Sequence, residues 1–405
     1  MSVDTEAQGS LDSLPYEALS PAQRQQRLRD LATVFFRLGA TAFGGPAAHI
    51  SMMDEEVVQR RQWLSREALL DLIGVTQLLP GPNSTELAIH IGFQRAGWPG
   101  LWVAGISFIL PAMVMVWALA ALYVHYQSVP QLQGLLYGIK PVIIALVVQA
   151  LWKLGRTALK DGPTLVAGCV ALVGYFAGID EIPLLLILGL VVSMVHRWPR
   201  PPQEQGALWL PLPGMFAQLG GWSGLIPGLP AWASVFGIFL KIGCVLYGGG
   251  YVLLAFLQRD FVDSQLLTSQ QLLDAVAIGQ FTPGPLFTTA TFVGYLVAGS
   301  AGAVAGTIGI FLPAFVLVGL VNPWIPALRR SPWTAGFLDG INAASLGLMA
   351  AVTYTLGQAS LVDGLTLILG IIGVIAVFRW RINSAWLVLA GGVIGLVAQA
   401  LGMVS

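Results

Sequence analysis

The sequence has 405 residues, of which 56% are hydrophobic and 10% are charged, and its 20 basic and 20 acidic side chains give zero net charge. Soluble proteins carry roughly 25% charged residues, so this composition excludes an ordinary soluble fold, and the balanced charge gives no reason to expect a nucleic-acid partner. Uncharged stretches such as 97–124, 340–362 and 384–404 are long enough to span about 30 Å of hydrocarbon. We therefore predict an all-α polytopic protein embedded in a lipid bilayer.

The chain begins with a polar segment, residues 1–30, that lacks the apolar run of a signal peptide. We interpret this segment as a cytoplasmic N-terminal tail. Residues 31–200 and 235–405 then form two similar units. The intervening residues 201–234 are a linker that is apolar enough to cross the membrane once.

An internal repeat defines these two units. The run from Phe43 to Pro46 (FGGP) is matched by the run from Tyr247 to Gly250 (YGGG). The segment 77–82 (QLLPGP) is matched by 280–285 (QFTPGP), and the later FILPA and FLPA motifs follow at nearly the same offset, close to 203 residues. Three ordered matches at one offset favour a duplication.

Each unit opens with two interrupted helical segments. In the first unit, one segment runs over 31–43, breaks at Gly44-Gly45 and resumes at Pro46, and the next runs over 66–79 and breaks at 80–82. The arms have about 13 residues, or roughly 20 Å of helix, which is shorter than the bilayer core. Arginines flank every end of both segments, which favours re-entrant hairpins entering from the cytoplasm. A pair of kinked spanning helices is the alternative.

Four longer apolar segments follow the hairpins in each unit, over 97–124, 132–154, 162–178 and 183–196 and again over 300–322, 333–358, 361–378 and 384–404. Basic loops occur at different steps of the two units, after the second long segment of the first unit but after the first long segment of the second. Basic loops face the cytoplasm, so the two repeats are predicted to be inverted relative to each other.

The breaks are the candidate substrate site. A helix that resumes inside the membrane offers unpaired N–H groups and a partial positive charge to an anion. Pro46 suits the first helical position, and Asn83 with Glu86 three residues later resembles an N-cap with a capping box. The candidate substrate-binding residues at the four breaks are Gly44, Gly45, Pro46, His49, Gln77, Pro80, Gly81, Pro82, Asn83, Ser84, Thr85, Gly248, Gly249, Gln280, Thr282, Pro283, Gly284 and Pro285.

Charged residues within the apolar arms are further candidates, because intramembrane charge is costly. Arg37 and Lys241 occupy matched positions and either supply positive charge to the substrate or pair with a nearby carboxylate. Asp71, Asp274 and Glu86 are candidates for coupling to an ion gradient, with interfacial anchoring or helix capping as the alternatives. No metal cluster, cofactor motif or catalytic constellation is found, so we expect a transporter without cofactors rather than an enzyme.

The FGGPAAHI run of residues 43–50 and the QLLPGPN run of residues 77–83 strongly resemble motifs of the chromate ion transporter family, and the second-unit runs YGGGY and QFTPGP resemble its second domain. The resemblance implies a long, two-domain member that exports chromate across the bacterial inner membrane and confers chromate resistance. It also implies that sulfate competes, and it leaves a homodimer open. The alternatives are a transporter or channel for another small anion and, in a different class, a membrane-embedded enzyme or scaffold. At the tips of the second unit, Leu286, Leu253 and Gly250 replace Asn83, His49 and Pro46.

Overall fold

The computed structural model describes residues 16–43, 45–126, 129–197, 225, 228–247, 250, 252–321, 332–380, 382 and 384–402. These residues form helices and short connections without a strand, as predicted. Four of the helices are long and apolar enough to cross a membrane. Most of the linker, and the arginines at 329 and 330, lie outside the described residues.

The first unit begins with a short 3₁₀ turn and continues as two broken segments followed by long helices. Its elements are η1 (Tyr16–Ala18), α2 (Pro21–Thr41), α3 (Pro46–Met53), η2 (Asp54–Arg60), α4 (Arg66–Thr76), α5 (Asn83–Tyr126), α6 (Pro130–Ala158), α7 (Gly162–Phe176) and α8 (Glu181–Arg197). Helix α5 is two helices in succession, because Ala96 and Gly97 have non-helical dihedral angles. The first of these is the returning arm of the second hairpin.

The second unit repeats this order. Its elements are α10 (Ala231–Val245), α11 (Leu253–Leu257), η4 (Gln258–Asp263), α12 (Ser269–Phe281), η5 (Leu286–Thr288), α13 (Thr289–Val321), α15 (Pro332–Ser360), α16 (Gly364–Ile375), η7 (Ala376–Trp380) and α17 (Ser384–Ala400). The kink of α5 recurs in α13 at Ala298 and Gly299. Matching kinks at matching positions confirm that the repeat seen in the sequence is a structural repeat.

Helix α2 begins ten residues before the predicted arm, inside the segment assigned to a tail. Ser20 accepts a hydrogen bond from the backbone N–H of Gln23, whose side chain caps Ser20 in return, and Pro21 occupies the first turn. This capping box starts a helix even though the residues that follow are polar. The capping residues are present in the sequence, but a hydropathy criterion does not detect a helix that begins with polar residues.

The four ends of the first two broken segments lie together. A guanidinium nitrogen of Arg27, near the start of α2, donates to the backbone oxygen of Arg95 at 3.3 Å. The guanidinium groups of Arg61, after η2, and Arg95, at the end of the first arm of α5, both lie over the ring of Trp63. A spanning helix would separate its ends, so these contacts fit two hairpins that return to the side from which they start.

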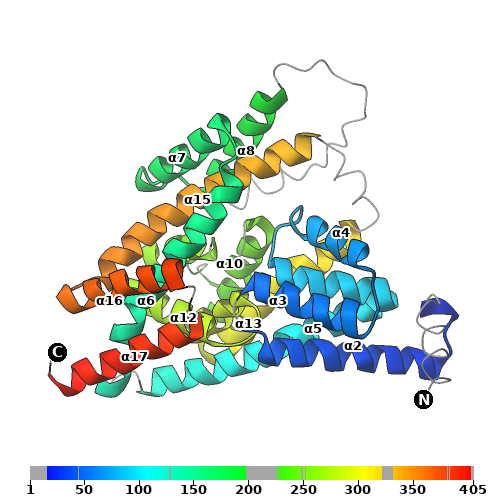
Figure 1. Cartoon of the computed structure of the whole chain (residues 1–405), viewed down its shortest axis with the longest axis horizontal. Coiled ribbons are helices and arrows are strands. Elements are labelled where there is room, and N and C mark those ends of the chain that lie inside the picture. Colours follow the sequence, from blue (N-terminus) through cyan, green and yellow to red (C-terminus); the bar gives the residue numbers. More distant parts are fainter. Residues whose placement is uncertain are drawn as a thin grey trace.

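The long helices of the two units are intertwined. Helices α7 and α8 pack on α15 of the other unit, while α16 and α17 pack on α6, as Figure 1 shows. Glycines allow the close approach: a Cβ on Gly347 of α15 would overlap the carbonyl oxygen of Gly168 of α7. A Cβ on Gly138 of α6 would likewise overlap the carbonyl oxygen of Gly391 of α17. Small residues of this kind permit backbones to meet in membrane proteins.

Helices α6 and α15, which are equivalent in the repeat, run antiparallel. Lys160, just after the end of α6, donates to Asp339 near the start of α15 at 2.6 Å. Tyr137, near the start of α6, donates to Asp363 just after the end of α15 at 2.5 Å. Because equivalent elements point in opposite directions, the two units are inverted, as the distribution of arginines predicts.

Candidate functional site

The breaks of one unit are hydrogen-bonded to the breaks of the other. The backbone N–H of Gly81 donates to the carbonyl oxygen of Leu246, at the end of α10, at 2.8 Å. Reciprocally, the N–H of Gly284 donates to the carbonyl oxygen of Ala42, at the end of α2, at 2.9 Å. Both glycines have positive φ angles, +142° and +96°, which side chains rarely adopt. The four breaks, which we call the tips, therefore meet in one place.

His49 connects two of the tips. Its Nε2 lies 3.1 Å from the carbonyl oxygen of Ala42, and its Nδ1 lies 3.2 Å from the hydroxyl oxygen of Ser84. A carbonyl oxygen only accepts, so Nε2 carries a hydrogen, and in a neutral ring Nδ1 then accepts from the Ser84 hydroxyl. The imidazole ring, 1% exposed, thus holds the end of α2 against the start of α5. The sequence marked His49 as a candidate without indicating this bridging role.

A small cavity lies between the tips. It is lined by Pro46, His49, Pro82, Asn83, Ser84, Gly250, Pro285, Leu286 and Phe287, which come from all four breaks. Its volume is about 10 Å³, roughly the space that one water molecule needs. A tetrahedral oxyanion is larger than a water molecule, so this conformation is closed around the site.

The start of α5 corrects one prediction. The N–H groups of Thr85 and Glu86 both donate to the carbonyl oxygen of Pro82, so Pro82 is the N-cap and Asn83 is the first helical residue. The predicted capping box between Asn83 and Glu86 is therefore wrong. Proline supplies no capping side chain, and Glu86 is fully buried with neither carboxyl oxygen hydrogen-bonded among the described residues.

The other predicted residues fall into three groups. Those buried beside the cavity, in the tips themselves, are Pro80, Gly81, Thr85, Thr282, Pro283 and Gly284. Gly45, also at a tip, caps α3 with a φ angle of +80°. Gln77 is exposed, and Gln280 has a buried side-chain nitrogen without a hydrogen-bond partner among the described residues. Gly44, Gly248 and Gly249 lie outside the described residues.

Arg37 and Lys241 do not line the cavity. Arg37, with a side chain 52% exposed, pairs with the carboxylate of Glu56 in η2. Lys241 pairs with Asp260 in η4 at 2.6 Å, and both side chains are almost fully buried. The alternative that the sequence left open, pairing with a carboxylate, is thus the arrangement found. These two carboxylates were not identified as partners from the sequence. Glu56 and Asp260 do, however, occupy positions that match each other at the repeat offset.

Asp274 and Asp71 differ although they are matched in the repeat. Asp274 is buried, accepts a hydrogen bond from the hydroxyl of Tyr123 at 2.8 Å and pairs with Lys140 at 3.0 Å. Asp71 is exposed on α4. The buried cluster ties α12 to α5 and α6, because its three members come from these three helices. The sequence placed none of the three together.

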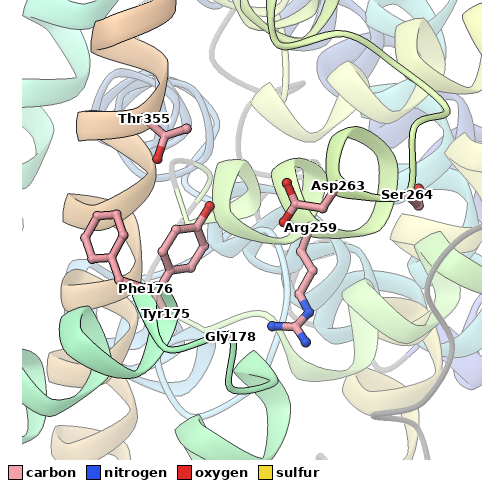
Figure 2. Close-up of a pocket in the computed structure, with 7 residues that line it drawn as sticks. All are labelled: Tyr175, Phe176, Gly178, Arg259, Asp263, Ser264 and Thr355. Carbon is pink, nitrogen blue, oxygen red and sulfur yellow. The ribbon is translucent and has the colours of Figure 1, made fainter.

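A larger cavity, of about 430 Å³, shares no lining residue with the cavity between the tips, and Figure 2 shows the residues that line it. It is lined by Tyr175, Phe176, Gly178, Arg259, Asp263, Ser264 and Thr355. The guanidinium of Arg259 pairs with Asp180 and, at 3.3 Å, with Glu181. With Asp263 also lining the wall, this cavity offers a dianion no uncompensated positive charge. The tips are therefore the better candidate for an anion site.

Comparison with known proteins places the chain in a family. The profile of the chromate transporter family matches residues 29–195 and 233–396, once in each unit. The chain is 30% identical over 408 residues to the chromate transport protein of Cupriavidus metallidurans, covering 98% of both chains. It is 32% identical over 381 residues to the chromate transport protein of Pseudomonas aeruginosa, covering 89% of this chain and 90% of the relative. No solved structure matches. The chain belongs to the chromate transporter family.

Proposed function

We propose that the protein is a secondary transporter that exports chromate from the cytoplasm across the bacterial inner membrane, conferring chromate resistance. The observation that carries the proposal is the meeting of the four tips, which brings the N-termini of α3 and α5 to one cavity beside the start of the η5–α13 segment. Helix N-termini with glycines beside them are sites where oxyanions bind.

The electrostatics explain why several tips must act together. A dianion that enters hydrocarbon faces a desolvation cost on the order of tens of kcal/mol unless donors replace its water. One partly buried helix N-terminus contributes about 2 kcal/mol. N–H groups from several tips and the Asn83 amide would therefore share the anion, and the Ser84 hydroxyl would join them once its hydrogen bond to His49 breaks. Arg37 and Lys241 act in this scheme as supporting charges, since both are already paired.

The direction follows from the charge of the substrate. An inside-negative membrane potential drives a dianion outward by about 4.6 kcal/mol per 100 mV, twice the value for one charge. The sequence has no phosphate-binding loop for nucleotide-driven transport. The closed cavity implies that the tips separate to admit the anion, which fits alternating access about a central site.

Chromate accumulation in cells that express the protein tests this proposal. We expect less intracellular chromate than in the vector control, because the membrane potential favours export. More chromate than in the control would instead show uptake and overturn the proposed direction. Unchanged accumulation at verified expression would argue against chromate transport altogether. Sulfate is the second candidate, since it has the same tetrahedral shape and charge, and excess sulfate should then slow chromate efflux.

Gly45 provides a prediction about the tips. The substitution Gly45→Ala should lower chromate export at least several-fold, because a φ angle of +80° costs a non-glycine residue about 1–3 kcal/mol. Space is not the limitation, since among the described residues only Leu286 lies near the new Cβ, at 4.0 Å. Gly178→Ala is the matched control, because Gly178, in the loop between α7 and α8, has a φ angle of +77° and its new Cβ would meet no atom of the described residues within 4 Å. Equal losses in the two variants would contradict a specific role of the tip.

The membrane orientation can be tested at equivalent loops. If α6 spans the bilayer, position 157 and position 362 lie on opposite sides, because they are next to its end and its start respectively. The basic loop at 153–160 predicts that its side is cytoplasmic. With Cys169 and Cys244 replaced by alanine, an impermeant thiol reagent should label Val362→Cys in intact cells and Thr157→Cys only after permeabilisation. The reverse pattern would refute the proposed orientation, and with it a cytoplasmic N-terminus.

A further inference from the structure

The least compensated ionisable group at the tips is Glu86. It lies in the first turn of α5, is 0% exposed, and neither carboxyl oxygen is hydrogen-bonded among the described residues. One carboxyl oxygen lies so close to Gly81 that a Cβ there would overlap it, and Ala314 of α13 lies behind. The carboxyl group therefore turns back onto the tip whose next residue, Pro82, lines the cavity.

Among the described residues, no cation pairs with Glu86 to compensate a negative charge. The titratable groups close by are Tyr247, before the break of α10, and His90, one turn further along α5 and buried with Nε2 unpaired among the described residues. His49 of α3 is occupied by two hydrogen bonds, to Ala42 and Ser84.

Charged side chains on the neighbouring helices have other contacts. On α2, Arg37 is held by Glu56, and the guanidinium of Arg27 reaches the backbone of Arg95. Asp274 of α12 is bound to Lys140 and Tyr123. On α4, Arg66, Glu67 and Asp71 are exposed, and Tyr295 is the titratable residue of α13. An ionised carboxylate in such a site would be buried without a partner, which costs far more than carrying a proton.

The hydrogen bond that joins the tips also occupies a donor beside Glu86. The N–H of Gly81 is directed to Leu246 of the other unit, so it is not available to the adjacent carboxyl group of Glu86. If the tips separate, this N–H and incoming water can both solvate a carboxylate. Closure therefore favours the protonated side chain, and opening favours the ionised one.

We infer that Glu86 is a proton-binding site at the tips and that an oxyanion is bound between closed tips only when Glu86 is protonated. This inference rests on the proposed function and adds proton linkage to it. A dianion beside an ionised Glu86 would meet a like charge in a site of low dielectric, whereas the neutral acid adds no repulsion. By linkage, proton binding then raises anion affinity, and anion binding draws in a proton.

The second unit has no carboxyl group at the position equivalent to Glu86. The position equivalent to Glu86 is Thr289, whose hydroxyl donates to the carbonyl oxygen of Leu286 at 2.8 Å and so needs no further partner. One carboxyl group thus serves both units, and the tips carry a single proton-binding position at this level of the repeat. The linkage should therefore not exceed one proton per bound anion.

The test is chromate binding by the purified full chain over the alkaline pH range in which chromate remains a dianion. For the wild type, the dissociation constant should rise with pH, by up to tenfold per pH unit, and chromate should draw up to one proton per bound ion from a weakly buffered solution. Glu86→Gln, which mimics the protonated acid, should bind chromate with little pH dependence and without proton uptake. Glu67→Gln, the same change at an exposed carboxylate of α4, should behave as the wild type does.

The outcomes separate the inference from the proposed function. Wild-type binding that does not vary with pH and takes up no proton would overturn the inference while leaving chromate binding intact. An unchanged pH dependence in Glu86→Gln would also overturn it. Should Glu86→Gln fail to fold, Glu86→Asp and the wild-type proton uptake still decide the question, since the aspartate variant should remain pH-dependent. Failure of the folded wild type to bind chromate at any pH would defeat the proposed function itself.

Discussion

Replacing Lys241 by methionine should destabilise the protein by about 3–5 kcal/mol, because it leaves the buried carboxylate of Asp260 without its cation. The measurement is thermal unfolding of the purified protein in detergent, together with the yield of folded protein. Arg37→Met is the matched control in the other unit. It should cost much less, because Arg37 is half exposed and Glu56 keeps a 2.8 Å contact with Arg61.

A double variant then separates structure from substrate binding. Lys241→Met combined with Asp260→Asn removes both charges and should recover most of the lost stability. If the pair serves only the fold, chromate export should recover with it. A double variant that folds but does not transport chromate would show that Lys241 also acts on the substrate. If Lys241→Met alone unfolded at the same temperature as the wild type, the buried ion pair between Lys241 and Asp260 would not be stabilising the fold.

Replacing Gly284 by alanine should abolish transport and lower the yield of folded protein. The φ angle of +96° is strained for alanine, and the new Cβ would meet the side chain of Ala112 at 2.6 Å and the carbonyl oxygen of Gly39 at 2.9 Å. The shift needed to relieve these contacts would also break the hydrogen bond to Ala42 that joins the two units. The summed cost is about 2–6 kcal/mol, from backbone strain and overpacking.

Gly299→Ala is the control for this prediction. Gly299 lies in the kink of α13 with a φ angle of +61°, and no atom of the described residues lies within 4 Å of the new Cβ. Gly299→Ala therefore introduces the same kind of backbone strain as Gly284→Ala. It causes no overlap of the new Cβ with other atoms of the described residues, and it disturbs neither of the hydrogen bonds that join the tips of the two units. Chromate efflux and unfolding temperature should both fall further in Gly284→Ala than in Gly299→Ala. Equal efflux and equal unfolding temperatures in the two variants would contradict a special role of the hydrogen bond between Gly284 and Ala42.

The membrane class, the internal repeat and the positions of the breaks could all be predicted from the sequence. Apolar composition and long uncharged runs require membrane helices, since few other structures satisfy the backbone in hydrocarbon. The breaks at Gly45 and at 80–82 could be predicted because glycine and proline act locally: their allowed backbone angles do not depend on distant residues. The inverted arrangement could be predicted as well, because arginines respond to the membrane rather than to packing.

The tertiary structure alone decided the partners. Whether Lys241 faces a substrate or Asp260, and whether Glu86 caps a helix or stays unpaired, depends on which helices pack together. Pairing across the units, as between Gly81 and Leu246, joins residues that are far apart in the sequence and leaves no local pattern. Local sequence patterns predict where a helix starts, but they do not predict which residues of other helices contact its first turn. That choice depends on burying polar groups with their partners, which is a property of the whole fold.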